Sequence, residues 1–468
     1  MSSDLRAALA HIPALDRFPT VDEMQAELDR LAQRYPDLVR VRRIGTSRLG
    51  EPIRMATVGD GECDALVFGG PHANEPVGFL AVRELAWLLC AEDRLRERLG
   101  FRWHLVPCVD PDAARLNESW YVRPDGRERY LRGFYRPATA EQVEWTFPHL
   151  REPGYFDRML PETVALARVI DEVRPEVQCA LHNSEYGGVF HYTTSDDPEL
   201  ADRLAEAADW AGLPLHNAVF QAPTGAIRPG VLRMPTAAEL ASAAGAAVAA
   251  TGASSGEYAR RHGTVTVVTE TPLWPDPRAA STGASGRSYA DVVADSLHIL
   301  DLSIHHLGHV LALADDDLRL DTPFRRSLSD MRRTADAVIA GWGVIAEASA
   351  SRRPASVAEE SSFEGLPHTL RLRAVATALR MLDAETACGN VRDGIRRARA
   401  EAEQLFHAWL RDAEVVLPDK PVDVRPAVVA QVATILAAAE HVGRRSAPPP
   451  VVIATAPARQ TRLVKAAS

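Results

Sequence analysis

A histidine and a glutamate three residues apart, His72 and Glu75, are the pair in this sequence whose types and spacing suggest chemistry most directly. An apolar run from Ala65 to Phe68 precedes them and predicts a buried strand, and two glycines and a proline then lead into a helix-like segment. Residues three apart on a helix share one face, so the imidazole and the carboxylate can bind one metal ion. The pattern predicts two metal ligands at a strand end, where open α/β sheets present functional groups.

The same spacing recurs at His149 with Glu152 and at His182 with Glu185. His149 follows no apolar run and precedes a turn-like stretch, which makes it a poor candidate ligand. His182 ends a second apolar run and is followed by polar, turn-forming residues. Because a catalytic zinc site takes three protein ligands and keeps a position for water, we expect His182 to be the third ligand. Glu185 remains an alternative to the glutamate of the first pair.

A further carboxylate, Glu270, ends a β-branched run that begins at Thr264 and stops before Pro272. Such a run predicts a strand. A carboxylate at the end of a strand and beside a metal ion can take a proton from water. Three strand-like runs therefore deliver His-x-x-Glu, His and Glu in that order, which favours a metal-dependent hydrolase.

In this ordered set of residues the chain resembles the zinc carboxypeptidases of the carboxypeptidase A type. The resemblance extends from about Pro19 to about Pro277. It includes the segment from Gly45 to Ile53, which looks like the family's Gly-x-Ser-x-x-Gly-x-Pro-Ile, and Asp110-Pro-Asp-Ala, where the family has Asn-Pro-Asp-Gly. The resemblance implies an α/β fold in which a mixed, mostly parallel sheet lies between helices.

Transferred position by position, the resemblance implies that His72, Glu75 and His182 hold one zinc ion and that Glu270 is the general base and proton shuttle. Zinc acidifies its bound water, and a neighbouring carboxylate can then accept a proton at neutral pH.

The family also uses an arginine to stabilise the developing oxyanion. Because the stretch after Asp110 departs from the family's spacing, Arg115, Arg132 and Arg136 are all candidates. An aromatic residue directly before Arg136 resembles the family's arrangement and favours it as a catalytic residue.

The substrate-binding residues are less well defined by the resemblance. The Asn-Arg pair with which the family binds a free carboxyl terminus has no clear counterpart in this sequence. Counting back from Glu270 without gaps places the family's substrate-covering tyrosine at Val248 and its side-chain pocket residue at Ser255. The candidates for substrate binding are Arg115, Asn117, Arg132, Ser255 and Tyr258.

The composition limits the other possibilities. The 468 residues leave room for two domains, and 46% hydrophobic residues are normal for a globular protein. A net charge of -10 gives no general attraction to nucleic acid or to anionic membranes. The N-terminus lacks the pattern of a secretory signal, and the apolar stretch from 427 to 440 is too short and interrupted to span a bilayer. We therefore expect a cytoplasmic protein without nucleic-acid or membrane partners.

We expect four segments: a lead-in over 1–18, a zinc carboxypeptidase-like catalytic domain over 19–316, a helical C-terminal region over 317–443 and a flexible tail over 444–468. In the catalytic domain, 279–288 reads as a flexible loop that could act as a lid. The helical region could shape the cleft or support a homo-oligomer. The pattern predicts helices at 328–348, 370–382, 391–410 and 428–442.

The sequence thus predicts a zinc metallocarboxypeptidase that cleaves a C-terminal residue from a peptide or peptide-like amide. One alternative is a small-molecule amidohydrolase or deacylase that acts on an acylated amino acid or a biosynthetic intermediate. Lack of the Asn-Arg pair favours that alternative somewhat. A second alternative is a non-catalytic binding protein in which the helical region is the functional part, against which the retained ligands and base argue.

Overall fold

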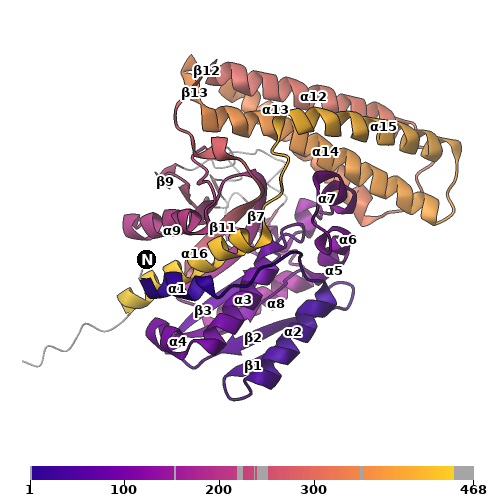
Figure 1. Ribbon diagram of the computed structural model, residues 1–468. Helices are drawn as coiled ribbons and strands as arrows, with labels where there is room; N and C mark the ends of the chain where they lie inside the picture. Colours follow the sequence, from indigo (N-terminus) through magenta and orange to yellow (C-terminus); the bar gives the residue numbers. More distant parts are fainter. Residues whose placement is uncertain are drawn as a thin grey trace, which may run out of the picture.

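A nine-stranded mixed sheet with helices on both faces forms the larger part of the molecule, and a layer of long helices lies at one end of it (Figure 1). The computed structural model describes residues 3–151, 154–218, 225–236, 238–239, 251–347 and 352–446. The predicted fold class, an α/β sheet with additional C-terminal helices, is confirmed.

The strand order in the sheet is β1-β2-β4-β3-β7-β11-β8-β10-β9. Parallel pairing joins β3 to β4 and β7, β7 to β11, and β8 to β10, and the other neighbours are antiparallel. The strands span Val39–Thr46 (β1), Pro52–Val58 (β2), Cys63–Gly69 (β3), Phe101–Val106 (β4), Val177–Gly187 (β7), Phe190–Thr193 (β8), Ala226–Arg228 (β9), Val231–Arg233 (β10) and Val265–Pro275 (β11). Two smaller ladders pair His149–Arg151 (β5) with Gly154–Phe156 (β6), and Ala284–Ser288 (β12) with Pro354–Ser356 (β13).

Helices cover both faces of the sheet. Helices α2, α3, α9 and α16 pack on one face, whereas α8 and α11 pack on the other. Helix α2 begins at a capping box, in which Thr20 and Glu23 each bind the other's backbone N–H. The helices up to α11 span Ser3–Ala10 (α1), Val21–Arg34 (α2), Val77–Ala91 (α3), Asp93–Leu99 (α4), Pro111–Arg115 (α5), Glu118–Tyr121 (α6), Arg127–Gly133 (α7), Pro161–Val173 (α8), Pro198–Ala211 (α9) and Ser255–Ala259 (α11).

The central strands β3, β7 and β11 coincide with the three predicted strand runs. Strand β7 is longer than predicted, because it continues past His182 to Gly187 instead of turning. It pairs on both sides, with β3 and β11, and the side chain of Asn183 donates to the Thr271 backbone and hydroxyl on β11. Pairing with β11, which runs to Gly187 after the pairing with β3 ends at Leu181, therefore outweighs the local turn preference of these polar residues.

The remaining helices are Tyr289–Ala312 (α12), Pro323–Glu347 (α13), Val357–Ala387 (α14), Asp393–Val416 (α15) and Val424–Ser446 (α16). The last four overlap the four predicted helices: α14 and α16 contain theirs, α13 begins earlier than predicted, and α15 begins two residues later and ends later. Their packing does not follow the predicted boundary at residue 317, because α12 buries apolar residues such as Val293 and Leu300 against α13 and α14. Helix α16 leaves this layer and returns to the sheet, where it packs on α3, α9 and β11 (Figure 1).

Helix α16 is also the one described helix that is long and apolar enough to cross a membrane, over Val424–Arg445. However, 89% of its most apolar window is buried inside the protein, as in an ordinary core helix. The segment proposed as a lid forms a short 3-10 turn, Pro277–Ala280, and then β12, which pairs with β13. The predicted tail lies outside the described residues from residue 447 onwards.

Candidate active site

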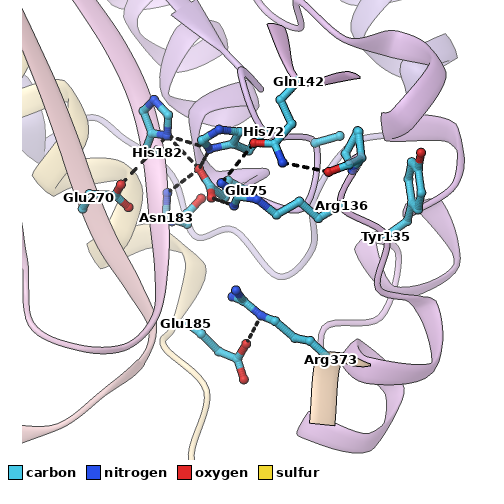
Figure 2. A network of polar contacts seen from close by, with 12 residues as sticks. His72, Glu75, Tyr135, Arg136, Gln142, His182, Asn183, Glu185, Glu270 and Arg373 are labelled. Carbon is cyan, nitrogen blue, oxygen red and sulfur yellow. Dashed lines mark hydrogen bonds and ion pairs between the residues drawn. The ribbon is translucent and has the colours of Figure 1, made fainter. Parts of the chain in front are cut away.

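Three buried side chains, His72, Glu75 and His182, meet just beyond the end of β3 and beside the middle of β7 (Figure 2). His182 lies on β7 one residue after Leu181, which pairs with Gly69 at the end of β3. Parallel pairing therefore brings the end of β3 next to His182 on β7, and the chain after β3 needs only a short turn to reach it. The structure thus unites the three residues that the sequence indicated as ligands.

A glycine with a positive φ and two hydrogen bonds to backbone carbonyls shape the turn after β3. Gly70 adopts a positive φ of 66°, a conformation that favours glycine, and a Cβ there would meet the Phe79 ring at 2.5 Å. The backbone N–H of Glu75 donates to the carbonyl of His72 at 3.0 Å, and the Tyr121 hydroxyl donates to the Ala73 carbonyl. Helix α3 begins only at residue 77, so the predicted helical placement of the pair is wrong: a turn, rather than a helix face, aims both side chains the same way.

The three donor atoms form a compact triangle. Nδ1 of His72 lies 3.1 Å from Nδ1 of His182, and Oε2 of Glu75 lies 3.2 Å and 2.9 Å from these two nitrogens. Zinc ligands bound at about 2.0–2.1 Å in a tetrahedron stand roughly 3.3 Å apart, so the triangle has nearly the size that zinc requires. Two histidines and a glutamate are also a common set of ligands for catalytic zinc. The residues present therefore fit this ion.

The charges around the triangle favour a cation at its centre. Burial lowers the pKa of His72 to about 3, and the charge of Arg136 contributes to this. Burial also opposes charge on His182, but its hydrogen bond to Glu75 and nearby carboxylates raise its pKa to about 9. Against burial, the two histidines lower the pKa of Glu75. One positive charge, here the proton on His182, is thus stabilised among the three donors, and a bound metal ion would supply that charge instead.

Glu270 faces this triangle from β11. In the ladder of β7 and β11 it is the direct partner of His182, and its Oε1 lies 3.9 Å from the His182 Nδ1. Burial and the charge of Glu75 raise the pKa of Glu270 to about 7. A carboxylate with a pKa near neutrality can both accept and return a proton at neutral pH, as a general base requires.

Arg136 is the one of the three arginine candidates that reaches the triangle. Its Nη1 donates to Oε1 of Glu75 at 2.7 Å, and its side chain borders the same cavity as Glu270. The Ser327 hydroxyl of α13 donates to the Arg136 carbonyl at 2.6 Å and fixes the backbone at this point. The geometry therefore favours Arg136 over the other two.

The other candidates from the same stretch are engaged elsewhere. Arg115 binds Asp22 at the start of α2 and Glu51 directly before β2. Asn117 is fully buried, and its side-chain amide forms hydrogen bonds with backbone groups, including the carbonyl and N–H of Tyr135.

Arg132 is also placed outside the cavity, because it binds Glu128 and Glu403 and lies over the Phe406 ring. The structure places none of Arg115, Asn117 and Arg132 against the cavity, so the hypothesis that they bind substrate is not supported. Asp22 and Glu403 lie far in sequence from Arg115 and Arg132, which is why the local pattern did not reveal these roles.

The predicted pocket residues lie behind the cavity wall. Ser255 is fully buried and donates through both its N–H and its hydroxyl to Oε1 of Glu144. The Tyr258 hydroxyl donates to Asp171 on α8, and Tyr258 is not among the residues that border the cavity. Val248 lies outside the described residues.

The two alternatives to the ligand set do not join it. His149 lies on β5, in the small two-stranded ladder, and Glu185 points away from the triangle and binds Arg127 and Arg373. In the described part of the chain, only the set of His72, Glu75 and His182 brings three potential ligands together.

A cavity of about 440 Å³ adjoins the triangle and includes residues that the sequence did not indicate. Glu144 borders it, and burial raises the pKa of this carboxyl group. Apolar side chains such as Phe190 and Tyr192 come from β8, and Leu370 and Arg373 come from α14. No local motif marks these positions, because they reach the cavity only through tertiary packing.

Comparison with known proteins agrees with this geometry. The sequence model described as zinc carboxypeptidase matches residues 24–274. No curated protein matches the chain.

Among solved structures, the metallo-carboxypeptidase from Burkholderia cenocepacia is 14% identical, with a TM-score of 0.37 over 70% of this chain and 69% of that one. The carboxypeptidase A from Helicoverpa armigera is 14% identical, with a TM-score of 0.38 over 72% and 78%. Values this low carry no argument, so the assignment depends on the sequence match. Because that match spans more than half of the chain, the protein belongs to the zinc carboxypeptidase family, whose members are hydrolases that bind one catalytic zinc ion.

Proposed function

We propose that the protein is a metallocarboxypeptidase that removes the C-terminal residue from a peptide or peptide-like amide. His72, Glu75 and His182 hold the zinc ion, and Glu270 is the general base. The observation that carries the proposal is the triangle of three donors within 3.2 Å of one another, with Glu270 paired to His182 across the strand ladder.

Each residue has a role that follows from its position. Zinc at the three donors supplies Lewis acidity, which acidifies water and polarises a carbonyl group. Glu270, with a pKa of about 7, accepts a proton from water at its carboxylate and delivers it to the departing amine. Arg136 borders the cavity and donates from its guanidinium group to the carbonyl oxygen as negative charge develops there.

Hydrolysis of a small amide is the second candidate function, and the helices that line the site favour it. Helices α13 and α14 contribute Thr334, Leu366 and Leu370 to the cavity wall, so a bound substrate would contact the helical region. A cavity of about 440 Å³ is in the range of sites for small ligands and accommodates a few residues of a peptide. Both candidates use the same triangle and base, and they differ only in what surrounds the scissile bond.

The test is a panel of short peptides and N-acylated amino acids, incubated with the zinc-loaded protein and followed by mass spectrometry. A carboxypeptidase shortens free peptides by single C-terminal residues and leaves C-terminally amidated peptides intact. Cleavage of acylated amino acids alone would support the second candidate. No cleavage of any amide by the zinc-loaded protein would contradict both and leave the binding-protein alternative.

The cytoplasmic location, the absence of nucleic-acid and membrane partners and a homo-oligomer through the helical region stay predictions. Fractionation of the source cells and light scattering of the purified protein would test them.

A further inference from the structure

Helix α14 presents one of its faces to the catalytic cavity, although it lies outside the residues that match the family. Leu366, Thr369, Leu370 and Arg373 border the cavity with the zinc-ligand candidates. Their spacing of three and four residues places them on a single side of the helix. Among these four, Arg373 is the only charged residue.

The helical region is firmly attached at this position. Arg380, two turns further along α14, donates to the carbonyls of Gly133 and Phe134 at 2.8 and 2.9 Å. The Ser327 hydroxyl of α13 holds the carbonyl of Arg136. The same helices thus fix the loop that carries Arg136 and position the face that borders the cavity, so Arg373 is part of the site's fixed architecture.

A buried carboxylate, Glu185, holds Arg373 at the cavity wall. The Arg373 Nε donates to Oε2 of Glu185 at 2.7 Å, and Figure 2 shows the arginine side chain reaching from α14 toward the triangle. Glu185 is almost fully buried and also accepts from Arg127 at 3.3 Å and from the Tyr130 hydroxyl at 3.3 Å. Two guanidinium groups therefore share the charge of Glu185, so this carboxylate is divided between Arg373 and Arg127.

Arg373 remains charged in this environment. Burial opposes its charge, but Tyr130 and Glu185 raise its pKa. Arg373 and Glu270 both line the cavity, so the two side chains face a common space. Arg136, the other arginine at the cavity, donates to Glu75 and has the oxyanion as its proposed partner.

We propose that Arg373 binds a carboxylate group of the substrate and is a specificity-determining residue that the helical region supplies to the site. A carboxylate is the group that a guanidinium binds best, by charge-assisted and often paired hydrogen bonds. The three sequence-based candidates for substrate binding that carry an amide or guanidinium group are engaged elsewhere, which leaves this role to Arg373. The proposal rests on the proposed function, because the carboxylate belongs to the hydrolysed substrate.

The carboxylate has two sources, a free C-terminus or an acidic side chain, and three peptide sets separate them. The first set has free C-termini and neutral side chains, the second has the same peptides amidated, and the third has amidated peptides that carry a glutamate. The zinc-loaded wild type is compared with Arg373→Gln, Arg373→Lys and the control Arg371→Gln. Arg371 lies on the same helix, binds Asp412 and does not border the cavity.

For the carboxylate-bearing set that the wild type cleaves, we expect kcat/KM of Arg373→Gln to fall roughly 10- to 100-fold, mainly through KM. Arg373→Lys, which keeps the charge, should recover part of this loss. The ratio of kcat/KM between carboxylate-bearing and neutral peptides should approach one in Arg373→Gln and stay at the wild-type value in Arg371→Gln. An unchanged ratio in Arg373→Gln, or a wild type without preference for a carboxylate, would overturn the proposal.

A binding measurement separates failure of this proposal from failure of the proposed function. Calorimetric titration of N-acetylphenylalanine and of its amide into the zinc-loaded proteins does not require turnover. Tighter binding of the acid by the wild type than by Arg373→Gln, with the amide unaffected, supports the role of Arg373 even if no peptide is cleaved. Equal binding of the acid by both proteins overturns it.

Discussion

The α/β part and the helical region contribute to one cavity in different ways. In the α/β part, strand pairing positions the reactive groups: Leu181 lies beside Gly69, and His182 lies beside Glu270. In the helical region, one face of α14 and Thr334 of α13 line the cavity, and Ser327 near the start of α13 holds the Arg136 loop. The sheet thus determines where bonds are broken, whereas the helices determine what fits next to that point. A change in the helices can alter the substrate while the reacting groups stay in place.

Replacing Glu270 by glutamine tests the contribution of the sheet and should have the largest effect on catalysis. The amide cannot accept a proton, so we expect kcat/KM to fall roughly 10²- to 10⁴-fold while the zinc content stays the same. Steady-state kinetics with elemental analysis of the same sample would check this. Full activity in Glu270→Gln would contradict the assignment of the base.

Replacing Arg136 by glutamine should lower kcat by roughly 10²- to 10³-fold, because a donor to the developing negative charge is lost. The matched control is Arg132→Gln, which removes an arginine from the same stretch that binds Glu403 outside the cavity. Kinetics of both variants on one substrate would separate the two arginines. A similar loss of activity in both would show that the effect is not specific to Arg136.

Replacing Leu372 by alanine tests whether the two regions fold together. Leu372 is fully buried on α14 in a core that also contains residues of the sheet. We expect the free energy of unfolding to decrease by about 2–5 kcal/mol in a single transition. Denaturant unfolding would measure this, with Leu302→Ala, on the exposed side of α12, as the control with little effect. Two separate transitions would show that the helical region is an independent unit.

Replacing Ser327 by alanine should give the smallest effect, because it removes one hydrogen bond to the Arg136 carbonyl. The expected loss is about 0.5–1.5 kcal/mol of stability and a decrease in kcat smaller than in Arg136→Gln. Ser361→Ala, whose hydroxyl binds a carbonyl of its own helix, is the control for the loss of a buried serine. Equal kcat in the two variants would indicate that α13 does not position the arginine.

The comparison of the two regions also explains what the sequence could predict. The strands before His72, His182 and Glu270 are apolar runs that end in a reactive residue, so a local pattern contains both the element and the group. The turn at His72 and the length of β7 depend on neighbours, such as the carbonyl that Tyr121 binds and the pairing of Asn183 with β11. The local sequence therefore could not predict these two features.

The substrate-binding candidates that lie away from the cavity show the same limit of prediction from local sequence. Arg115, Asn117 and Arg132 are polar residues in the expected stretch, but their partners come from α2, from the Tyr135 backbone and from α15. Arg373 gave no signal at all, because it joins the cavity through helix packing about 190 residues after Glu185. Groups that act through tertiary contacts with distant helices need the structure to be found.

The zinc content of the purified protein is the most direct test of the central claim that His72, Glu75 and His182 hold one zinc ion. Elemental analysis after zinc loading and dialysis compares the wild type, His182→Ala and His149→Ala, whose histidine lies outside the triangle. We predict about one zinc per chain in the wild type and in His149→Ala, and almost none in His182→Ala. Full zinc content in His182→Ala, or a wild type that retains no zinc, would contradict the assignment.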